Sequence, residues 1–195
     1  MSLNMERQTK YYTYEEYAAL DDGNRYELHN GRLCLMAGVS RFHGIASGEI
    51  YGQLYDHLKG KTCEVHHSSY EVRLWKDDDT AYEPDVFVVC DPSKLKDKYC
   101  EGAPDFIAEV LSPSTCFNDK IIKFHNYRDT GVKEYWIVDT ADKTVAAHRL
   151  IDKQYVTQYY SETDKAPIQA LDGFLIDLSL VFRDPPKSDE HEESE

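Results

Sequence analysis

The chain has 195 residues, 41% of them hydrophobic, which is enough for one domain with a substantial core. The 22 Lys and Arg against 36 Asp and Glu leave a net charge of −14, which argues against a general basic nucleic-acid-binding protein. No apolar run approaches the roughly 18 residues of a membrane helix, and the N-terminus lacks the apolar core of a secretory signal, so we expect a cytoplasmic protein with no membrane segment.

The two ends differ from the body of the chain. We expect residues 1–12 to be flexible and to include a remnant of cloning, with Met5 as the natural start. Residues 184–195 carry six acids against one lysine, and this composition predicts an acidic disordered tail. The domain is then expected at residues 13–183, and because the tail accounts for −5 of the −14, the rest of the chain still carries −9.

The N-terminal half contains clear helix and turn signals. Thr13 and Glu16 have the spacing of a capping box and predict a short helix over residues 13–20. Asn30-Gly31 lies between two alternating runs and predicts a β-hairpin. Leucine and isoleucine residues four apart predict an amphipathic helix over residues 43–58.

The rest of the chain reads mainly as strands. The expected strands lie within residues 64–75, 85–90, 106–111, 134–139, 144–150 and 154–160. A helix is expected from Asn118 or Asp119 to about Thr130, with Gly131 directly after it. Between these elements we expect a polar loop at residues 91–104 and a turn at 112–115. A strand, a helix and another buried strand in sequence predict an α/β or α+β sheet with helices packed on it.

Two further expectations concern side chains outside these patterns. We expect Leu175, Leu178 and Val181 to pack on the core after the Asp172-Gly173 turn. The His66-His67 pair is expected on a strand surface. The cysteines show no zinc-site or redox spacing, so we expect reduced thiols at Cys34, Cys63, Cys90, Cys100 and Cys116.

Two of the expected buried strands carry an acidic residue. Asp85 begins the apolar run DVFVVC, and Glu109 lies within FIAEVL, on the side of the strand that also carries Ile107. If these strands are neighbours, the two carboxylates converge at one edge of the sheet and repel each other unless a cation lies between them. Hard oxygen ligands favour Mg²⁺ or Mn²⁺ in that position.

The helix that follows supplies a cationic group. Lys123 lies one turn into this helix, and its amine can reach back toward the carboxylates, where it could position or deprotonate a water or stabilise charge on a phosphate. Simpler roles stay open for each residue. Asp85 could cap a strand, Lys123 could be a solvated helix residue, and Glu109 could form a buried ion pair with Lys123 or Arg128.

At these residues the chain resembles a known pattern. Pro84-Asp85 followed by Glu109-Val110-Leu111 is similar to the PD-(D/E)XK nuclease signature. More closely, the chain resembles the Uma family of putative restriction endonucleases through YELHNGRL, YEPDVFVV, GAPDFIAEVLSPST, DKIIKFHNYRDTGVKEYWIVD and LDGFLIDL. Leu111 stands where the superfamily pattern has its lysine. The resemblance implies a migrated lysine, which maps to Lys123.

The resemblance implies a restriction-endonuclease-like α+β fold, with a central mixed sheet flanked by helices. It also implies Mg²⁺-dependent hydrolysis of DNA, with Mn²⁺ as a substitute, and a homodimer as a common assembly. Asp85, Glu109 and the Val110 carbonyl would hold the metal, and Lys123 would orient the attacking water. The family's N-terminal glutamate maps to Glu27, and His43 is a further candidate for lining the site, although a structural role is at least as well supported for both.

Two other functions stay open at this point. One is a catalytically inactive interaction or regulatory module, against which the retained acid–acid–lysine set argues. The other is a metal-dependent hydrolase of RNA or another phosphodiester. The charge of −9 counts against the endonuclease, because binding to a phosphate backbone normally needs clustered Lys and Arg.

Overall fold

The computed structural model describes residues 10–36, 38–75, 79–111 and 119–185. The turn expected at residues 112–115 lies outside these ranges, as do the first nine residues and the tail beyond Pro185.

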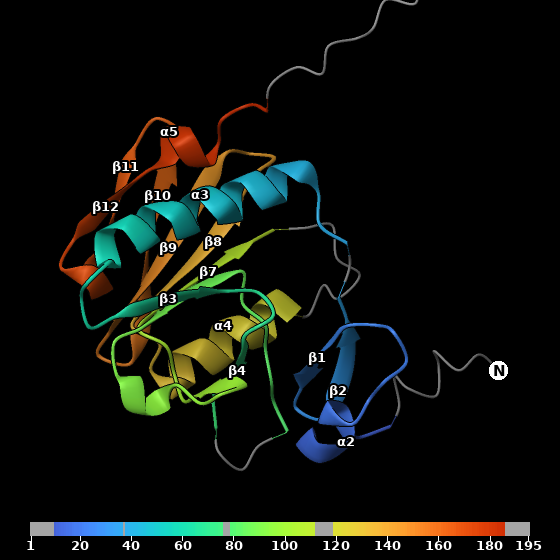
Figure 1. Cartoon of the computed structure of the whole chain (residues 1–195). Coiled ribbons are helices and arrows are strands. Elements are labelled where there is room, and N and C mark those ends of the chain that lie inside the picture. Colours follow the sequence, from blue (N-terminus) through green and yellow to red (C-terminus); the bar gives the residue numbers. More distant parts are fainter. Residues whose placement is uncertain (1–9, 37, 76–78, 112–118, 186–195) are drawn as a thin grey trace, which may run out of the picture.

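The centre of the molecule is a mixed six-stranded sheet in the order β10-β9-β8-β7-β5-β3 (Figure 1). Its strands are β3 (Glu64–His67), β5 (Val86–Val89), β7 (Phe106–Val110), β8 (Glu134–Asp139), β9 (Thr144–Ile151) and β10 (Gln154–Ser161). Strands β7 and β8 are parallel, and the other neighbours are antiparallel. Helix α4 (Asp119–Thr130) connects the parallel pair, as a parallel connection requires. The predicted mixed sheet is therefore confirmed.

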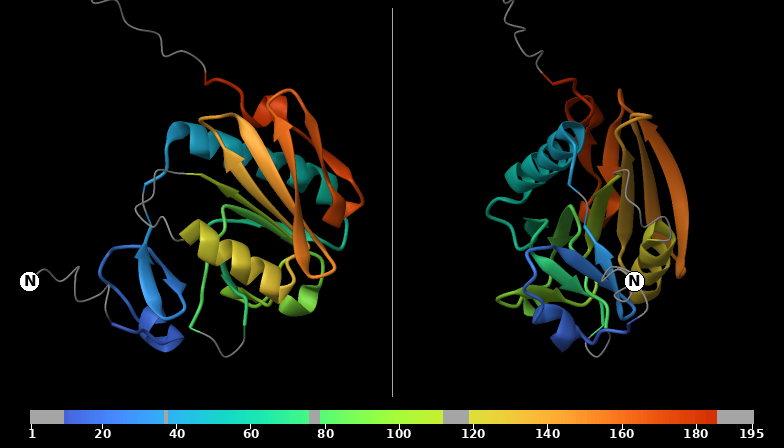
Figure 2. Two further views of the ribbon diagram at one scale, coloured as in Figure 1. Left: turned by 180° about the vertical axis from the view of Figure 1, so that it is seen from behind. Right: turned by 90° about the vertical axis from the view of Figure 1, so that its right-hand side faces the viewer.

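One long helix packs on each face of this sheet, as the two views of Figure 2 show. Helix α3 (Arg41–Leu58) buries the row of apolar residues predicted from their four-residue spacing, including Ile50 and Leu54, against one face. Helix α4 buries Tyr127 against Ile107 and Tyr135 on the other face. The strands between them are buried on both sides, which explains why β5 is apolar throughout.

The N-terminal elements form as the sequence predicts. Helix α2 (Tyr14–Ala18) begins at a complete capping box of Thr13 and Glu16. Strands β1 (Tyr26–His29) and β2 (Arg32–Leu35) form the hairpin, in which Asn30 and Gly31 both have positive φ, as a two-residue hairpin turn requires. One boundary was wrong: Tyr12 is buried and donates its N–H to the Gly31 carbonyl at 2.8 Å, so the folded domain begins before residue 13.

The expected loop at residues 91–104 contains regular structure. It holds a 3₁₀ turn, η1 (Pro92–Lys94), and strand β6 (Tyr99–Glu101), which pairs in parallel with β4 (Glu71–Arg73). The sequence could not show this pairing, because β6 is short and its partner lies almost thirty residues upstream.

The C-terminal segment adds a third two-stranded sheet, which lies beside α3. Strands β11 (Lys165–Ile168) and β12 (Phe174–Asp177) are joined through η2 (Gln169–Leu171), and α5 (Leu178–Val181) follows directly. The expected burial of Leu178 and Val181 is confirmed, but Leu175 is 51% exposed. Leu175 points away from the core because neighbouring residues of a strand face opposite sides, and Ile176 takes the buried side.

The prediction of reduced thiols was wrong for three cysteines. Cys63 and Cys90 form a disulfide, because they are the next cross-strand pair beyond Glu64 and Val89 in the antiparallel pairing of β3 and β5. Cys34 is disulfide-bonded as well. Cys100 is a free thiol, and burial raises its pKa to about 12.

His148 gives the sheet a predicted pH dependence. Its Nδ1 lies 2.8 Å from the Thr157 hydroxyl, whereas its buried Nε2 has no hydrogen-bond partner among the described residues. Burial lowers the pKa of His148, so the folded state binds fewer protons than the unfolded state and stability falls as the pH drops below about 6.5. We expect the urea concentration at the unfolding midpoint to change less between pH 7.5 and 5.5 for His148→Gln than for wild type. Equal changes in the two proteins would contradict this role.

Candidate active site

The pairing of β5 with β7 brings the two predicted carboxylates together. Val86 is opposite Ala108, so Asp85 and Glu109 stand across from each other one step further along the strands. The Asp85 Oδ2 accepts the backbone N–H of Val110 at 2.8 Å. The predicted convergence is therefore present, and it lies where β7 ends.

Lys123 reaches the same point from α4. Its Nζ donates to Glu109 Oε1 at 2.9 Å and to Glu27 Oε1 at 2.8 Å, and the residue is only 9% exposed. The alternative of a solvated helix lysine was wrong. The buried ion pair with Glu109 that the sequence left open is present, and Glu27 of β1 makes it a triad.

The two glutamates differ in their electrostatic surroundings. Burial raises the pKa of Glu109 to about 7, and the nearby charges of Asp85 and Glu27 act in the same direction against Lys123. Burial also opposes ionisation of Glu27, but Lys123 and His29 outweigh it and hold the pKa of Glu27 at about 2. The pKa of Lys123 is raised well above its ordinary value, because the two carboxylates outweigh its burial. Lys123 is therefore a charged ammonium group.

His43 lies in the first turn of α3, on the side that faces the site. Ser40 caps this helix, which directs the buried His43 ring toward the end of β7. Its Nε2 lies 3.1 Å from Asp85 Oδ2. Burial lowers the pKa of His43, but Asp85 and Glu109 together raise it above its ordinary value. His43 therefore contacts Asp85, one of the groups that the sequence assigned to a metal.

The oxygen atoms around Asp85 and Glu109 are of the kind that Mg²⁺ prefers. Three carboxylates, Glu27, Asp85 and Glu109, face one lysine, so the cluster has a surplus of negative charge that a divalent cation would offset. No hydrogen bond from a described residue reaches Asp85 Oδ1 or Glu109 Oε2. Within the described ranges no three His, Cys, Asp or Glu side chains are arranged to hold a metal. A site of two carboxylates and one carbonyl fits Mg²⁺, which keeps several of its waters.

Sequence reasoning missed the residues that hold the charged groups in place. The Tyr127 hydroxyl donates to Glu109 Oε1 at 3.0 Å, and the ring of Tyr82 lies 5.3 Å from the Lys123 ammonium. His29 Nε2 lies 3.0 Å from Glu27 Oε2. Tyr127 could have been found, because it follows Lys123 by four residues on one helix face. His29 could have been found as well, because it follows Glu27 by two residues on the same side of β1. Tyr82 comes from a distant segment with no local signal.

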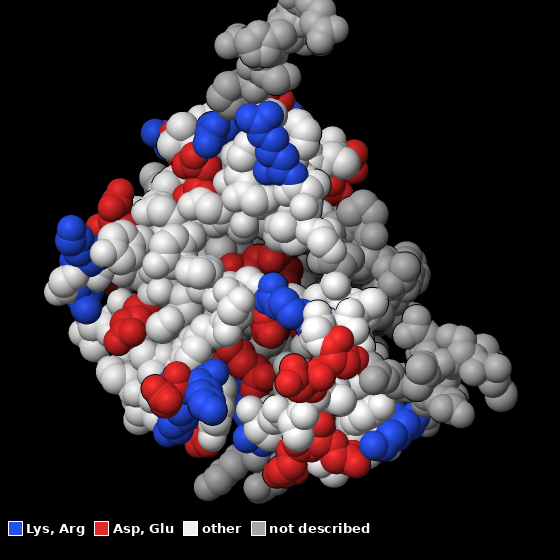
Figure 3. All heavy atoms as spheres, turned by 45° about the vertical axis from the view of Figure 1, so that its right-hand side comes forward, with Lys and Arg blue, Asp and Glu red and all other residues white. Residues whose placement is uncertain are grey.

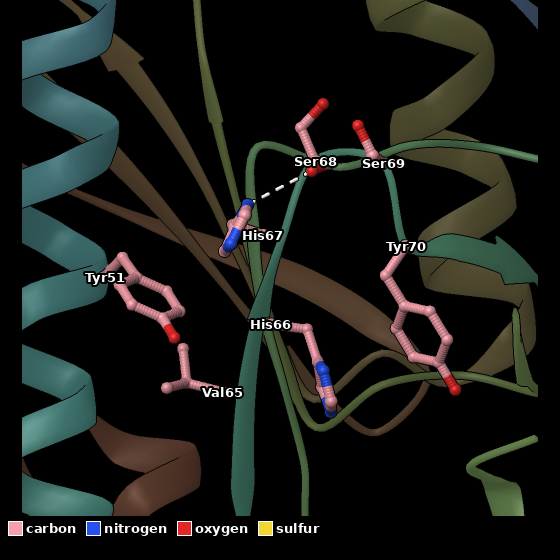
Figure 4. Close-up of a pocket in the computed structure, with 7 residues that line it drawn as sticks. All are labelled: Tyr51, Val65, His66, His67, Ser68, Ser69 and Tyr70. Carbon is pink, nitrogen blue, oxygen red and sulfur yellow. Dashed lines mark hydrogen bonds between the residues drawn. The ribbon is translucent and has the colours of Figure 1, made fainter. Parts of the chain in front are cut away.

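The surface around the site is acidic and hollowed. Figure 3 brings forward the side on which β1 and the end of β7 lie, and it shows acidic side chains within a central hollow beside a Lys or Arg. An open pocket of about 290 Å³ lies next to this region along the edge of β3 (Figure 4). Tyr51, His67 and Ser68 line one side of it, and the Ser68 N–H donates to the Asp85 carbonyl at 3.2 Å. Ser68 therefore connects the wall of this pocket to the backbone of Asp85.

The fold and the site together define a restriction-endonuclease-like α+β protein. Comparison of the sequence with known families agrees with this class: residues 13–180 match the family Uma2, described as "Putative restriction endonuclease". The chain belongs to this family.

Two individual relatives are similar to the chain over most of its length. Two proteins of Synechocystis sp. are similar to the chain, and both are described as uncharacterized. The protein slr1290 is 26% identical over 173 residues, which cover 87% of this chain and 90% of the relative. The protein sll1609 is 29% identical over 137 residues, which cover 67% and 76%.

A crystal structure described as a putative nuclease belonging to DUF820, from Anabaena variabilis ATCC 29413, shares the fold. The TM-score is 0.71 at 16% identity, and the match covers 87% of this chain and 97% of that one. Among the helices of the described residues, none is long and apolar enough to cross a membrane.

Proposed function

We propose that the protein is a metal-dependent phosphodiesterase that cleaves DNA internally, with Mg²⁺ as its cofactor and Mn²⁺ as a substitute. The observation that carries the proposal is the meeting of Asp85, Glu109 and Lys123 at the end of β7, with the Val110 backbone beside them. Membership in a family described as "Putative restriction endonuclease" supports the same chemistry.

Each residue has a defined task in this proposal. Asp85, Glu109 and the Val110 carbonyl would hold the Mg²⁺, which when bound lowers the pKa of a coordinated water and offsets charge on the scissile phosphate. Lys123 would orient an attacking water and would donate to the phosphate oxygens as their charge builds. Glu27 holds the Lys123 ammonium in place, and both residues are largely shielded from water. Their position is therefore fixed before substrate arrives.

The acidic surface limits how the substrate can bind. Because the body of the chain carries −9, few phosphates can be held by Lys and Arg, and affinity must come mainly from the site itself and from contacts to bases. Nucleic acid as the partner follows from the family, and DNA rather than RNA is our proposal. A homodimer and a cytoplasmic location are also proposed, although stable disulfides such as Cys63–Cys90 are rare in the cytosol.

One observation favours a second candidate, a nuclease-fold module that does not cut. His43 pairs with Asp85 and Lys123 pairs with Glu109, so each of the two carboxylates already has a nitrogen partner without a metal. A module that does not cut would keep these two pairs and bind no metal at the remaining carboxylate oxygens.

Titration calorimetry with Mn²⁺ separates the two candidates. We expect one Mn²⁺ to bind wild type, and binding to be lost in Asp85→Asn and in Glu109→Gln. Asp105→Asn is the control, since Asp105 is a more deeply buried acid at the other end of β7 and accepts from Cys90 N–H at 2.7 Å and Lys133 at 2.6 Å. Absence of Mn²⁺ binding by wild type, with the fold intact by circular dichroism, would favour the inactive module.

A further inference from the structure

Strand β10 is an outer edge of the central sheet. It pairs with β9 on one side, and no strand of the described residues pairs with its other side. Figure 2 shows it at the margin of the sheet. The strand is eight residues long and reads QYVTQYYS, without a single charged residue or proline. Natural proteins seldom leave an edge of this length and composition open to water, because it invites pairing with another strand.

The hairpin that joins β9 to β10 determines which backbone groups point outward. Asp152 and Lys153 both have positive φ and form a two-residue turn, which closes on the hydrogen-bonded pair Ile151 and Gln154. The Leu150 N–H donates to Lys133 on the opposite side, which agrees with this alternation. The N–H and C=O groups of every second residue after Gln154 bind β9, and those of Tyr155, Thr157 and Tyr159 point outward.

Two large side chains of β10 are exposed to solvent. Tyr159 is 73% exposed and Val156 is 55% exposed, on opposite faces of the strand. Tyr155 by contrast packs on the core and donates its hydroxyl to the Val132 carbonyl at 3.0 Å. The edge therefore combines exposed side chains on both faces with outward backbone groups that pair with no strand of the described residues, and these features favour pairing with another strand.

We propose that β10 pairs antiparallel with β10 of a second copy of this chain, about a two-fold axis through Thr157. The three outward-facing residues are symmetric about Thr157, so each finds an outward-facing residue of the partner chain, with about six hydrogen bonds in all. Tyr159 then lies across from Tyr155 of the partner subunit, and the two rings form a cross-strand aromatic pair. The uncharged strand offers no like charge to repel the second copy in an otherwise acidic protein.

The pairing leaves the candidate active site open. Strand β10 is three strands away from β7 in the sheet, so two copies joined at β10 keep both sites at a distance from the interface. The inference therefore rests neither on a bound metal nor on nuclease activity, and it assigns the surface by which the proposed homodimer forms.

Sedimentation velocity over a range of concentrations tests the dimer. We expect wild type to sediment as a dimer, and Tyr159→Lys to weaken association at least about tenfold, because two lysines would face the paired edges. Tyr55→Lys is the matched control: Tyr55 is an exposed tyrosine of α3, and the same substitution there should leave the dimer intact. Neither side chain is buried, so both variants should fold. A wild type that stays monomeric at high concentration, or a dimer that Tyr159→Lys leaves unchanged, overturns the proposal.

Amide hydrogen exchange tests strand pairing directly. In the dimer the outward-facing N–H groups of Thr157 and Tyr159 should exchange more slowly than in the monomer that is present at low protein concentration. The N–H groups of Val156 and Gln158 should be protected at every concentration, since they already bind β9. Equal protection of Thr157 and Tyr159 in monomer and dimer would place the interface elsewhere.

Discussion

Replacing Lys123 with methionine is expected to lower the free energy of unfolding by about 3–5 kcal/mol near pH 8, the usual effect of removing one partner of a buried ion pair. The Lys123 ammonium is the shared donor to Glu27 and Glu109, at 2.8 and 2.9 Å. Methionine has nearly the same length and keeps the packing of the alkyl chain. The decrease in the free energy of unfolding therefore measures the cost of leaving two buried carboxylates without their cation. Urea denaturation followed by circular dichroism measures it.

The same variant should recover part of its stability in acid. Without Lys123 the buried carboxylates have pKa values raised above those of the unfolded chain, so the folded state binds more protons and stability rises as the pH falls toward 5. Adding Glu27→Gln to Lys123→Met should also restore stability, because one of the two repelling charges is removed. Lys143→Met is the control, since Lys143 pairs with Glu162 on the exposed surface and should contribute little. Wild-type stability in Lys123→Met would show that the triad is not a structural ion pair.

The main elements of the fold could be predicted because their signals are local. The capping box of α2, the Asn30-Gly31 turn and the four-residue spacing in α3 each lie within one short segment, and all three form as expected. Strand β6 and the Cys63–Cys90 disulfide depend on partners 27 or more residues away. Spacing along the chain carries no information about such pairs until the sheet order is known.

The candidate site shows the same division. Glu109 could be singled out because a carboxylate in an apolar strand must have a partner, and Lys123 was close enough in the chain to be named as that partner. Glu27 and His43 could be named only through the family resemblance. That Glu27 shares the ammonium, and that His43 contacts Asp85, depends on how the hairpin and α3 pack against the sheet.

Glu109→Gln is expected to lower the rate of the proposed Mg²⁺-dependent DNA cleavage by about 10³-fold or more, because it removes the charge of a proposed metal ligand, and such sites act through electrostatic stabilisation. Glutamine can still accept hydrogen bonds from Lys123 and from the Tyr127 hydroxyl, which Glu109 now receives at 2.9 and 3.0 Å. The fold should therefore survive the change. Single-turnover cleavage of supercoiled plasmid, with matched single-stranded DNA and RNA substrates, measures the rate and identifies the preferred nucleic acid.

Asp105→Asn separates loss of chemistry from loss of structure in this assay. Asp105 is buried in the same sheet and holds the Cys90 N–H and Lys133, so its removal should destabilise the protein without touching the site. Per folded molecule, Asp105→Asn should cut DNA at close to the wild-type rate, whereas Glu109→Gln should not. If both variants lose activity in proportion to their stability, Glu109 acts on the fold alone. If wild type binds Mn²⁺ yet cleaves none of the three substrates, the metal site serves a reaction other than hydrolysis of nucleic acid.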